Sequence, residues 1–271
     1  MPIHPTALVD PGARIHETAD VGPYVIIGNN VQVGAGTRVM PFVLIYEGVT
    51  IGENNFIHSH AVLGDKPQHL AYDGGPRRTV IGDHNTLREY VTINRPFHAD
   101  GETRIGNHCF LMANSHVGHD SVVGDHVILT NGALLGGHVT VMDKAIISGN
   151  CGVHQFVRIG RLAMMQGLSG ASKDVPPYMV TVRINEVAGL NVIGMRRAGF
   201  SQEARNQVKQ AYRILYREGN SVPAALEKLK AGGFGPEVQE LITFIEGSKR
   251  GICAPVRQSS AGVPPADLDA V

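Results

Sequence analysis

The sequence predicts a parallel β-solenoid, in which short strands and turns coil around one core, followed by a small helical domain. Large aliphatic residues recur every six positions through roughly the first two thirds of the chain, and helical spacing replaces this period after about residue 172. Stepping by six from Ile3 to Met165, 25 of the 28 positions carry Ile, Val, Leu or Met.

A period of six fits neither the 3.6 residues of a helical turn nor the alternation of one long strand. Each six-residue unit is therefore expected to form a strand and a turn. The aliphatic residue and a small or β-branched residue four places later point inward. Glycine often follows the aliphatic residue, as at Gly118 and Gly136, and is expected to supply backbone freedom at the corners. Three units make an 18-residue coil, and stacked coils share one core.

Two stretches interrupt the period, at residues 64–79 and 95–104. Both are rich in Pro, Gly and charged residues, so we expect loops that leave the coil. Loops inserted into a repeat array often carry function. The solenoid with these two insertions is assigned to residues 1–182.

Residues 183–253 are predicted to form a small C-terminal helical domain. Ser201 is expected to cap a first helix, in which Val208, Ala211 and Leu215 follow helical spacing. Further helices are expected from near Ser221 and near Pro236. Residues 254–271 are rich in Pro, Ala, Ser and Asp and are expected to be a disordered tail.

Composition excludes several classes of protein. The 24 Lys and Arg residues balance 24 Asp and Glu residues, which argues against a polycation built to bind nucleic acid. No stretch approaches the ~18 apolar residues of a membrane span, and the N-terminus lacks a signal-peptide pattern. Cys109, Cys151 and Cys253 are too few and too scattered for a disulfide framework. We expect a soluble, cytoplasmic protein with neither a membrane span nor a nucleic-acid partner.

A polar cluster follows from the 18-residue coil, because residues 18 apart should stack about 4.8 Å from one another. Three columns result: Gly118, Gly136 and His154; His119, Gly137 and Gln155; and Asp120, His138 and Phe156. A single histidine here would more often be an ordinary surface residue. The convergence of histidines, a carboxylate, an amide and glycine backbone at one corner favours a site, and histidine suits proton transfer.

Other chemistries are less favoured by the same residues. Zinc-binding solenoids similar to γ-class carbonic anhydrases use a His pair five residues apart, a spacing absent among the 13 histidines, so no metal site is expected. Cys109 and Cys151 occupy the small inward position, where burial explains them better than nucleophilic catalysis. A passive, non-catalytic solenoid that serves as a binding module remains an alternative.

Specific motifs over about residues 2–251 resemble the acyl-ACP–UDP-N-acetylglucosamine O-acyltransferases, a family of hexapeptide-repeat acyltransferases. The motifs are His-x-x-His-Asp at 116–120, Gly137-His138, His154-Gln155-Phe156, residues 174–178, and Gly189-Leu190-Asn191 with Arg196-Arg197. The resemblance implies a left-handed parallel β-helix and a homotrimer with active sites between neighbouring subunits. It also implies acyl carrier protein and a UDP-sugar as partners, with no cofactor beyond the acyl thioester.

The resemblance further implies transfer of a 3-hydroxyacyl group to the 3-position of UDP-N-acetylglucosamine, the first step of lipid A biosynthesis. His119 would be the general base, Asp120 would orient it, and the Gly137 amide would stabilise the oxyanion. Gly167 would lie along the acyl chain. The residues implied to contact the nucleotide sugar are His116, His138, His154, Gln155, Asn191 and Arg197.

Part of the surroundings departs from the family pattern. His69, Ala71 and Asn94 stand where the family usually has Asp, Lys and His. His69 and Asn94 are still expected to contact the acceptor sugar. Because the hydrogen-bond donors and acceptors at these positions differ from the family pattern, the enzyme is expected to have a different preference for the acceptor sugar. An N-acyltransferase that acts on a 3-amino UDP-sugar is therefore an alternative to the O-acyltransferase.

Overall fold

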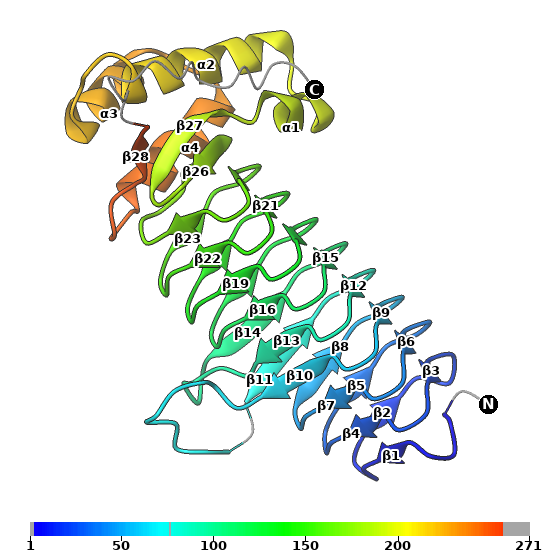
Figure 1. The fold of residues 1–271 in the computed structure, drawn as a ribbon. Coiled ribbons are helices and arrows are strands. Elements are labelled where there is room, and N and C mark those ends of the chain that lie inside the picture. Colours follow the sequence, from blue (N-terminus) through cyan, green and yellow to red (C-terminus); the bar gives the residue numbers. More distant parts are fainter. Residues whose placement is uncertain (1–2, 76, 257–271) are drawn as a thin grey trace.

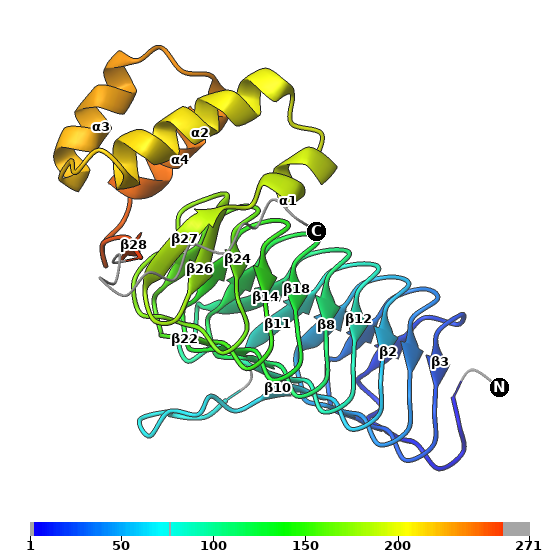
Figure 2. The same cartoon turned by 45° about the horizontal axis from the view of Figure 1, so that its top comes forward.

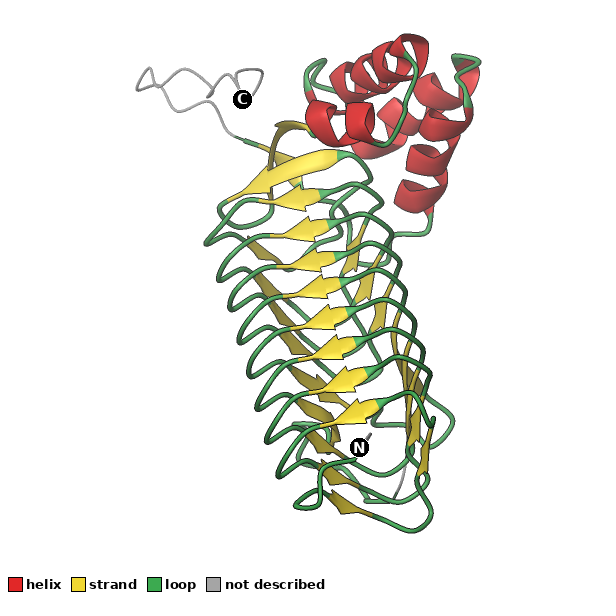
Figure 3. Ribbon diagram, turned by 90° about the vertical axis from the view of Figure 1, so that its right-hand side faces the viewer, coloured by secondary structure: helices red, strands yellow, loops and turns green. Residues whose placement is uncertain are grey.

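The computed structural model describes residues 3–75 and 77–256, and it confirms the expected solenoid with a helical domain. Three sheets of short parallel strands form the sides of a prism, an arrangement typical of a left-handed β-helix. Four helices sit at its C-terminal end (Figure 1). Figure 3 shows the regular stacking of strands along one side of the prism.

Each sheet is named here by its first strand. The β1 sheet contains β1 (Leu8–Val9), β4 (Ile26–Ile27), β7 (Leu44–Ile45), β10 (Val62–Asp65), β13 (Thr92–Asn94), β16 (His116–Val117), β19 (Leu134–Leu135), β22 (Gly152–Val153) and β25 (Gly170–Ala171). The β2 sheet contains β2 (Arg14–Ile15), β5 (Gln32–Val33), β8 (Val49–Ile51), β11 (Arg78–Ile81), β14 (Glu102–Ile105), β17 (Val122–Val123), β20 (Thr140–Val141) and β23 (Arg158–Ile159).

The β3 sheet contains β3 (Asp20–Val21), β6 (Arg38–Val39), β9 (Phe56–Ile57), β12 (Thr86–Leu87), β15 (Phe110–Leu111), β18 (Ile128–Leu129), β21 (Ile146–Ile147), β24 (Met164–Met165), β26 (Met179–Val182), β27 (Glu186–Leu190) and β28 (Ala254–Pro255). Its last strands differ from the coil, because β27 runs antiparallel to β26. The strands β26 to β28 join the solenoid to the helical domain.

The core is a column of aliphatic side chains along the prism axis. Leu111, Leu129 and Ile147 stack in successive coils of the β3 sheet and are fully buried. The small inward position is also buried, and Cys109 and Cys151 occupy it as expected. Burial raises the pKa of the Cys109 thiol to about 11, which keeps it protonated and unreactive near neutral pH.

The glycines after the aliphatic residues have a different role from the one expected. Gly118 and Gly136 do not adopt positive φ; instead, the left-handed corner positions are held mostly by other residues, such as Asp120 and His138. A Cβ atom on Gly118 would come within 2.7 Å of the carbonyl carbon of Gly136 in the next coil. These glycines are therefore required by the close approach of neighbouring coils, and the expectation of backbone freedom there was wrong.

The two insertions preserve the register of the coil. Val62 pairs with Thr92 instead of with the residue 18 positions on, so the first insertion adds 12 residues. Thr92 then pairs with His116, so the second adds six. Both lengths are multiples of six, which explains why the aliphatic period resumes in the same phase. The first insertion leaves the prism between β10 and β11 and protrudes from its side (Figure 2).

The helical domain contains α1 (Val192–Arg197), α2 (Gln202–Tyr216), α3 (Val222–Ala231) and α4 (Pro236–Glu246). The expected N-cap of α2 is confirmed, since the Ser201 hydroxyl accepts a hydrogen bond from the peptide N–H of Ala204. Ser221 caps α3 in the same way, by accepting from the peptide N–H of Ala224. An ion pair fixes α4 to the last coils: Arg161 Nη2 lies 2.6 Å from Glu240 Oε2, which also accepts a hydrogen bond from the Tyr178 hydroxyl.

Two boundaries differ from the sequence-based assignment. The sheet continues beyond residue 182, because β27 extends it to Leu190, and α1 precedes the first expected helix. The expected tail, residues 254–271, begins with β28, while residues 257–271 lie outside the described residues. Within the described part of the chain, no helix has both the length and the apolar character needed to cross a membrane.

Candidate active site

The expected columns form at one corner of the prism, where strands of the β1 sheet end. His116 pairs with Leu134 and Leu134 pairs with Gly152, so the residues that follow them are stacked coil upon coil. The peptide nitrogen of His138 bonds to the carbonyl of His119. We call the group of residues 118–120, 136–138 and 154–156 the His119 corner. The 18-residue spacing thus predicted the arrangement of this corner.

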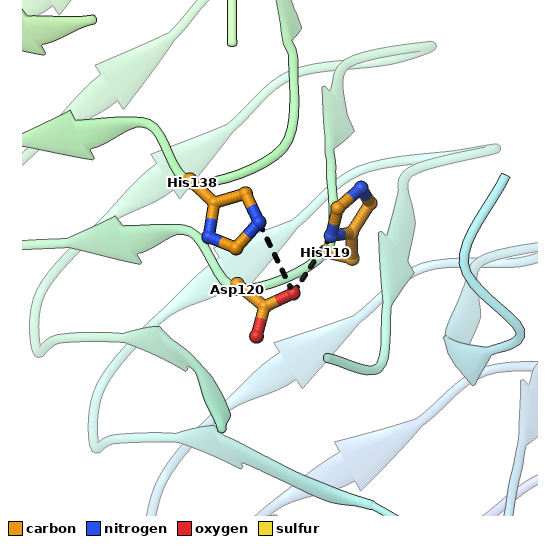
Figure 4. A group of neighbouring side chains, drawn as sticks. All are labelled: His119, Asp120 and His138. Carbon is orange, nitrogen blue, oxygen red and sulfur yellow. Dashed lines mark hydrogen bonds and ion pairs between the residues drawn. The ribbon is translucent and has the colours of Figure 1, made fainter. Parts of the chain in front are cut away.

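His119 and Asp120 form a hydrogen-bonded pair at this corner. The Nδ1 atom of His119 lies 2.7 Å from Oδ2 of Asp120, and both side chains are about nine-tenths buried. His138 approaches the same carboxylate oxygen from the other side, with Nε2 at 3.8 Å (Figure 4). Because a carboxylate oxygen only accepts, the His119 proton belongs on Nδ1, which leaves Nε2 with a lone pair.

Gly137 lies directly against the free side of the His119 ring. A Cβ atom at this position would stand only 2.5 Å from Nε2 of His119, so no larger residue fits without moving the ring. The peptide N–H of Gly137 has no acceptor among the described residues. A backbone donor without an acceptor and an imidazole nitrogen with a lone pair therefore belong to two residues in direct contact. A base beside an oxyanion donor is the combination that acyl transfer requires.

A cavity of about 640 Å³ opens beside this pair, which is within the usual size range of small-molecule sites. It is bounded by the β1 sheet, the first insertion and the turn that carries Ile184. Its lining residues are Gln68, His69, Asn94, His116, Gly118, His119, Leu134, Leu135, Gly136, Gly137, Gly152, Val153, His154, Gln155, Gly170, Ala171, Ser172 and Ile184.

Most of the site residues expected from the sequence meet at this cavity. Besides His119 and Gly137, it brings together His69, Asn94, His116, His154 and Gln155. Asp120 and His138 do not line the cavity and lie behind His119. The ring of His138 stacks on that of Phe156 with centroids 4.5 Å apart.

Three of the expected residues lie elsewhere on this chain. Asn191 caps α1, where its side chain accepts from the Gly194 amide and donates to the carbonyl of Leu162. Arg197 is exposed at the end of α1, and Gly167 is exposed at another corner of the prism. None of the three lines the cavity of its own chain.

The structure also adds lining residues that were not singled out. Gln68 comes from the first insertion, while Leu134 and Gly152 continue the strand positions of His116. Gly170 follows in the same column, because it pairs with Gly152. Extending the 18-residue register by one more coil would have found Gly170. Ile184 belongs to a turn outside the repeat, so no periodic signal marks it.

His119, Asp120 and His138 are close enough to be considered as metal ligands, since one donor atom of each lies within 4.8 Å of the others. The geometry nevertheless matches a hydrogen-bonded pair. Oδ2 of Asp120 already accepts from His119 and, at 2.8 Å, from the peptide N–H of Phe97. A cation at that oxygen would have to displace both donors, so these residues do not fit a metal site well.

Burial changes the proton affinity of the neighbouring histidines. Burial, followed by the nearby His119 charge, lowers the pKa of His116, whose Nδ1 lies 2.7 Å from the Thr92 hydroxyl. Burial also lowers the pKa of His138, although the adjacent Asp120 acts in the opposite direction. Both changes favour neutral imidazoles, which can exchange hydrogen bonds with a polar ligand as donor or acceptor.

Comparison with known proteins gives consistent results along the chain. Residues 174–253 match the family described as UDP-N-acetylglucosamine O-acyltransferase, domain 2, and residues 102–137 match the bacterial transferase hexapeptide family of six repeats. Residues 3–98 match the GMPPB C-terminal domain family.

Individual relatives cover nearly the whole chain. An acyl-[acyl-carrier-protein]–UDP-N-acetylglucosamine O-acyltransferase of Anaeromyxobacter sp. (strain Fw109-5) is 45% identical over 255 residues, which cover 93% of this chain and 99% of the relative. The crystal structure of UDP-N-acetylglucosamine O-acyltransferase (LpxA) from Moraxella catarrhalis RH4 superposes with a TM-score of 0.89 at 42% identity, covering 93% of this chain and all of that one. The acyltransferase of Francisella novicida gives a TM-score of 0.91 at 36% identity, covering 98% and 99%.

Because the pKa of His116 is lowered in the folded protein, we expect the free energy of unfolding to depend on pH. Below about pH 6.5 the unfolded chain protonates His116 while the folded protein keeps it neutral, so the unfolded state binds more protons. The free energy of unfolding should therefore decrease as the pH falls from about 6.5 towards the folded-state pKa. Replacing the histidine, as in His116→Asn, should remove part of this decrease.

Urea denaturation at about pH 7.5 and about pH 5.5, at one protein concentration, measures the effect. The difference between the two pH values should be smaller in the variant than in the wild type. His138 and His58 also have lowered pKa values and account for a remaining difference. An unchanged difference in the variant would show that His116 does not contribute.

Proposed function

The chain belongs to the family of acyl-[acyl-carrier-protein]–UDP-N-acetylglucosamine O-acyltransferases, and we propose that the His119 corner is its active site. It is an enzyme that transfers an acyl group from acyl carrier protein to UDP-N-acetylglucosamine, in the first step of lipid A biosynthesis. Membership in an enzyme family decides against the non-catalytic solenoid. We further propose a 3-hydroxyacyl group as the donor and the sugar 3-hydroxyl as the acceptor.

One observation carries the assignment: the His119 ring lies between the Asp120 carboxylate and the unpaired amide of Gly137. With its proton on Nδ1, His119 uses Nε2 to take the proton of the sugar hydroxyl as the oxygen attacks the thioester carbonyl. The new C–O bond makes a tetrahedral oxyanion, which accepts a hydrogen bond from the Gly137 N–H. The C–S bond then breaks, and the proton on Nε2 passes to the departing thiolate.

The remaining polar residues of the cavity suit a nucleotide sugar. His116, His154 and Gln155 offer neutral donors and acceptors along the β1 sheet, and His69 approaches from the first insertion. His138 contacts Asp120 and acts as a positioning residue for the carboxylate in this proposal. Since the thioester is already activated, this reaction requires no redox or metal cofactor. The cytoplasmic location expected from the sequence stays a prediction.

We propose acyl carrier protein, an acidic protein, as the docking partner of the helical domain. Between residues 183 and 251, 11 Lys and Arg residues outnumber 7 Asp and Glu residues, although the whole chain is neutral. Such a local excess of positive charge steers an acidic partner and increases its rate of association.

The general-base role makes a direct prediction. His119→Ala should lower turnover by ~10²–10⁴-fold, the usual contribution of a general base, while the protein remains folded. His16→Ala is the matched control, since the His16 side chain is exposed in the first coil and, among the described residues, its ring bonds only to neighbouring Thr18. Turnover is measured by mass spectrometry of reactions with acyl-ACP and UDP-N-acetylglucosamine. Near-normal turnover of the His119 variant would disprove the assignment.

We propose that the enzyme is a homotrimer whose sites lie between subunits. The support is that Gly167, Asn191 and Arg197 lie away from the cavity of their own chain. They could contact the same substrate only from a neighbouring copy. Sedimentation equilibrium should give three times the 29.0 kDa chain mass. A stable monomer with full activity would contradict the proposal.

Asn94 favours a second candidate acceptor, the 3-amino analogue of the sugar. Its side chain is 5% exposed, and its Nδ2 donates to the carbonyl of Lys66, which fixes the orientation of the amide. Its Oδ1 then has no donor within the described residues. A sugar hydroxyl has one proton, which His119 takes. A neutral amine has two, so it can give one to His119 and one to Asn94.

A competition assay tests the acceptor. We expect the 3-amino analogue to be acylated at least as efficiently as UDP-N-acetylglucosamine when both compete for one acyl-ACP donor. Asn94→His, which restores the usual family residue, should shift the preference towards the hydroxyl sugar. A clear preference of the wild type for UDP-N-acetylglucosamine would contradict the proposal of a 3-amino acceptor and support the O-acyltransferase activity alone.

A further inference from the structure

The second insertion packs against Asp120 and contacts its carboxylate. The peptide N–H of Phe97 donates to Oδ2 of Asp120 at 2.8 Å. This is the same oxygen that accepts the His119 proton at 2.7 Å. The carboxylate oxygen that orients the proposed base is therefore itself oriented by the main chain of the insertion.

Gly101 packs against the other carboxylate oxygen. A Cβ atom on Gly101 would clash with Oδ1 of Asp120, because the two atoms would lie closer than 3.0 Å, a separation that Cβ atoms in proteins essentially never show. The next nearest atoms are the Cβ of Pro96 at 3.1 Å and the carbonyl oxygen of His98 at 3.2 Å. Gly101 does not have positive φ, so its backbone does not require glycine. The close approach to Asp120 is what requires it.

Thr103 holds the main chain of the same residue. Its hydroxyl accepts a hydrogen bond from the peptide N–H of Asp120 at 2.8 Å, and the Thr103 side chain is fully buried. Asp120 has a φ of +58°, a left-handed conformation that is unfavourable for a residue with a side chain. A buried partner for its peptide N–H stabilises this conformation. The insertion thus contacts both carboxylate oxygens of Asp120, and Thr103, in the strand β14 that follows it, holds the backbone of Asp120.

We propose that Phe97, Gly101 and Thr103 form a cradle that positions the Asp120 carboxylate for His119, with Gly101 and Thr103 as positioning residues. This inference rests on the proposed roles of His119 and Asp120. Neither Gly101 nor Thr103 lines the cavity of its own chain. Their expected effect is therefore on the rate of the chemical step, through the position of the Asp120 carboxylate.

Gly101→Ala is the first test. The added methyl displaces the carboxylate, so kcat should fall ~10–100-fold while the KM values for acyl-ACP and the sugar change little, since a displacement of about 1 Å can cost this much. Asp100→Ala is the control, because Asp100 is the exposed neighbour in the same turn. It should retain wild-type kcat. An equal loss in both variants, or a rise in KM alone, would overturn the proposal.

A second pair of variants separates positioning from loss of folding. Thr103→Val removes the acceptor for the Asp120 peptide N–H and should lower kcat, whereas Thr103→Ser keeps the hydroxyl and should restore most of it. Thermal denaturation verifies that each variant is folded. If Ser and Val lower kcat equally in folded protein, the hydroxyl does not position Asp120.

A double-mutant cycle distinguishes this inference from the proposed function. In an Asp120→Ala background the added methyl of Gly101→Ala meets no carboxylate, so it should cause no further loss of kcat. If Gly101→Ala lowers kcat in the Asp120→Ala background as much as it does in the wild type, Gly101 does not act through Asp120 and the proposed cradle is wrong. If Asp120→Ala alone leaves kcat unchanged, the proposed role of Asp120 fails. If Asp120→Ala lowers kcat and Gly101→Ala does not, only the cradle fails.

Discussion

The structure depends on the parallel pairing of each strand residue with the residue one coil further on. Most strands are only two residues long, so each pairing supplies few hydrogen bonds. The register is fixed by the side chains instead, because a shift of one residue would turn the buried aliphatic column outwards. Once Val117 pairs with Leu135 and Leu135 with Val153, the polar residues that follow must also stack. The His119 corner is a consequence of this register.

The insertions show how function is added without disturbing that register. They add 12 and six residues, so every later aliphatic residue still points inward. Arg95, in the second insertion, connects it to the first by donating a hydrogen bond to the carbonyl of Gly64. The Arg95 side chain is 3% exposed, and it also forms an ion pair with Oε1 of Glu47 at 2.9 Å. Only the Arg95 side of this pair is buried, and leaving that charge without partners would be costly. The first insertion then brings His69 to the cavity, and the second brings Phe97 to Asp120.

The sequence predicted what depends on periodicity and missed what depends on tertiary contact. The six-residue period predicted the solenoid, the buried Cys109 and the stacking of His119 on Gly137. Helix capping by Ser201 predicted the start of α2. The period could not predict that Phe97 donates a main-chain hydrogen bond to Asp120, because the second insertion follows no repeat. It also could not show that Asn191 does not line the cavity of its own chain, since the helical domain lies beyond the coil.

The His119 corner is a modified form of a structural feature found at all three corners. Each corner places a residue with positive φ, which costs about 1–2 kcal/mol where a side chain is present. At two corners, stacked rings offset this cost: Tyr24 on Phe42 with centroids 5.2 Å apart, and His108 on His126 at 4.8 Å. At the third corner His138 stacks on Phe156, but the coil below carries Asp120 in place of a ring. A carboxylate cannot stack, so it needs hydrogen-bond donors instead. The neighbouring imidazole of His119 and the amide of Phe97 are those donors. The exchange of a ring for a carboxylate thus replaces one stacking contact by the hydrogen-bonded pair on which the proposed proton transfer rests.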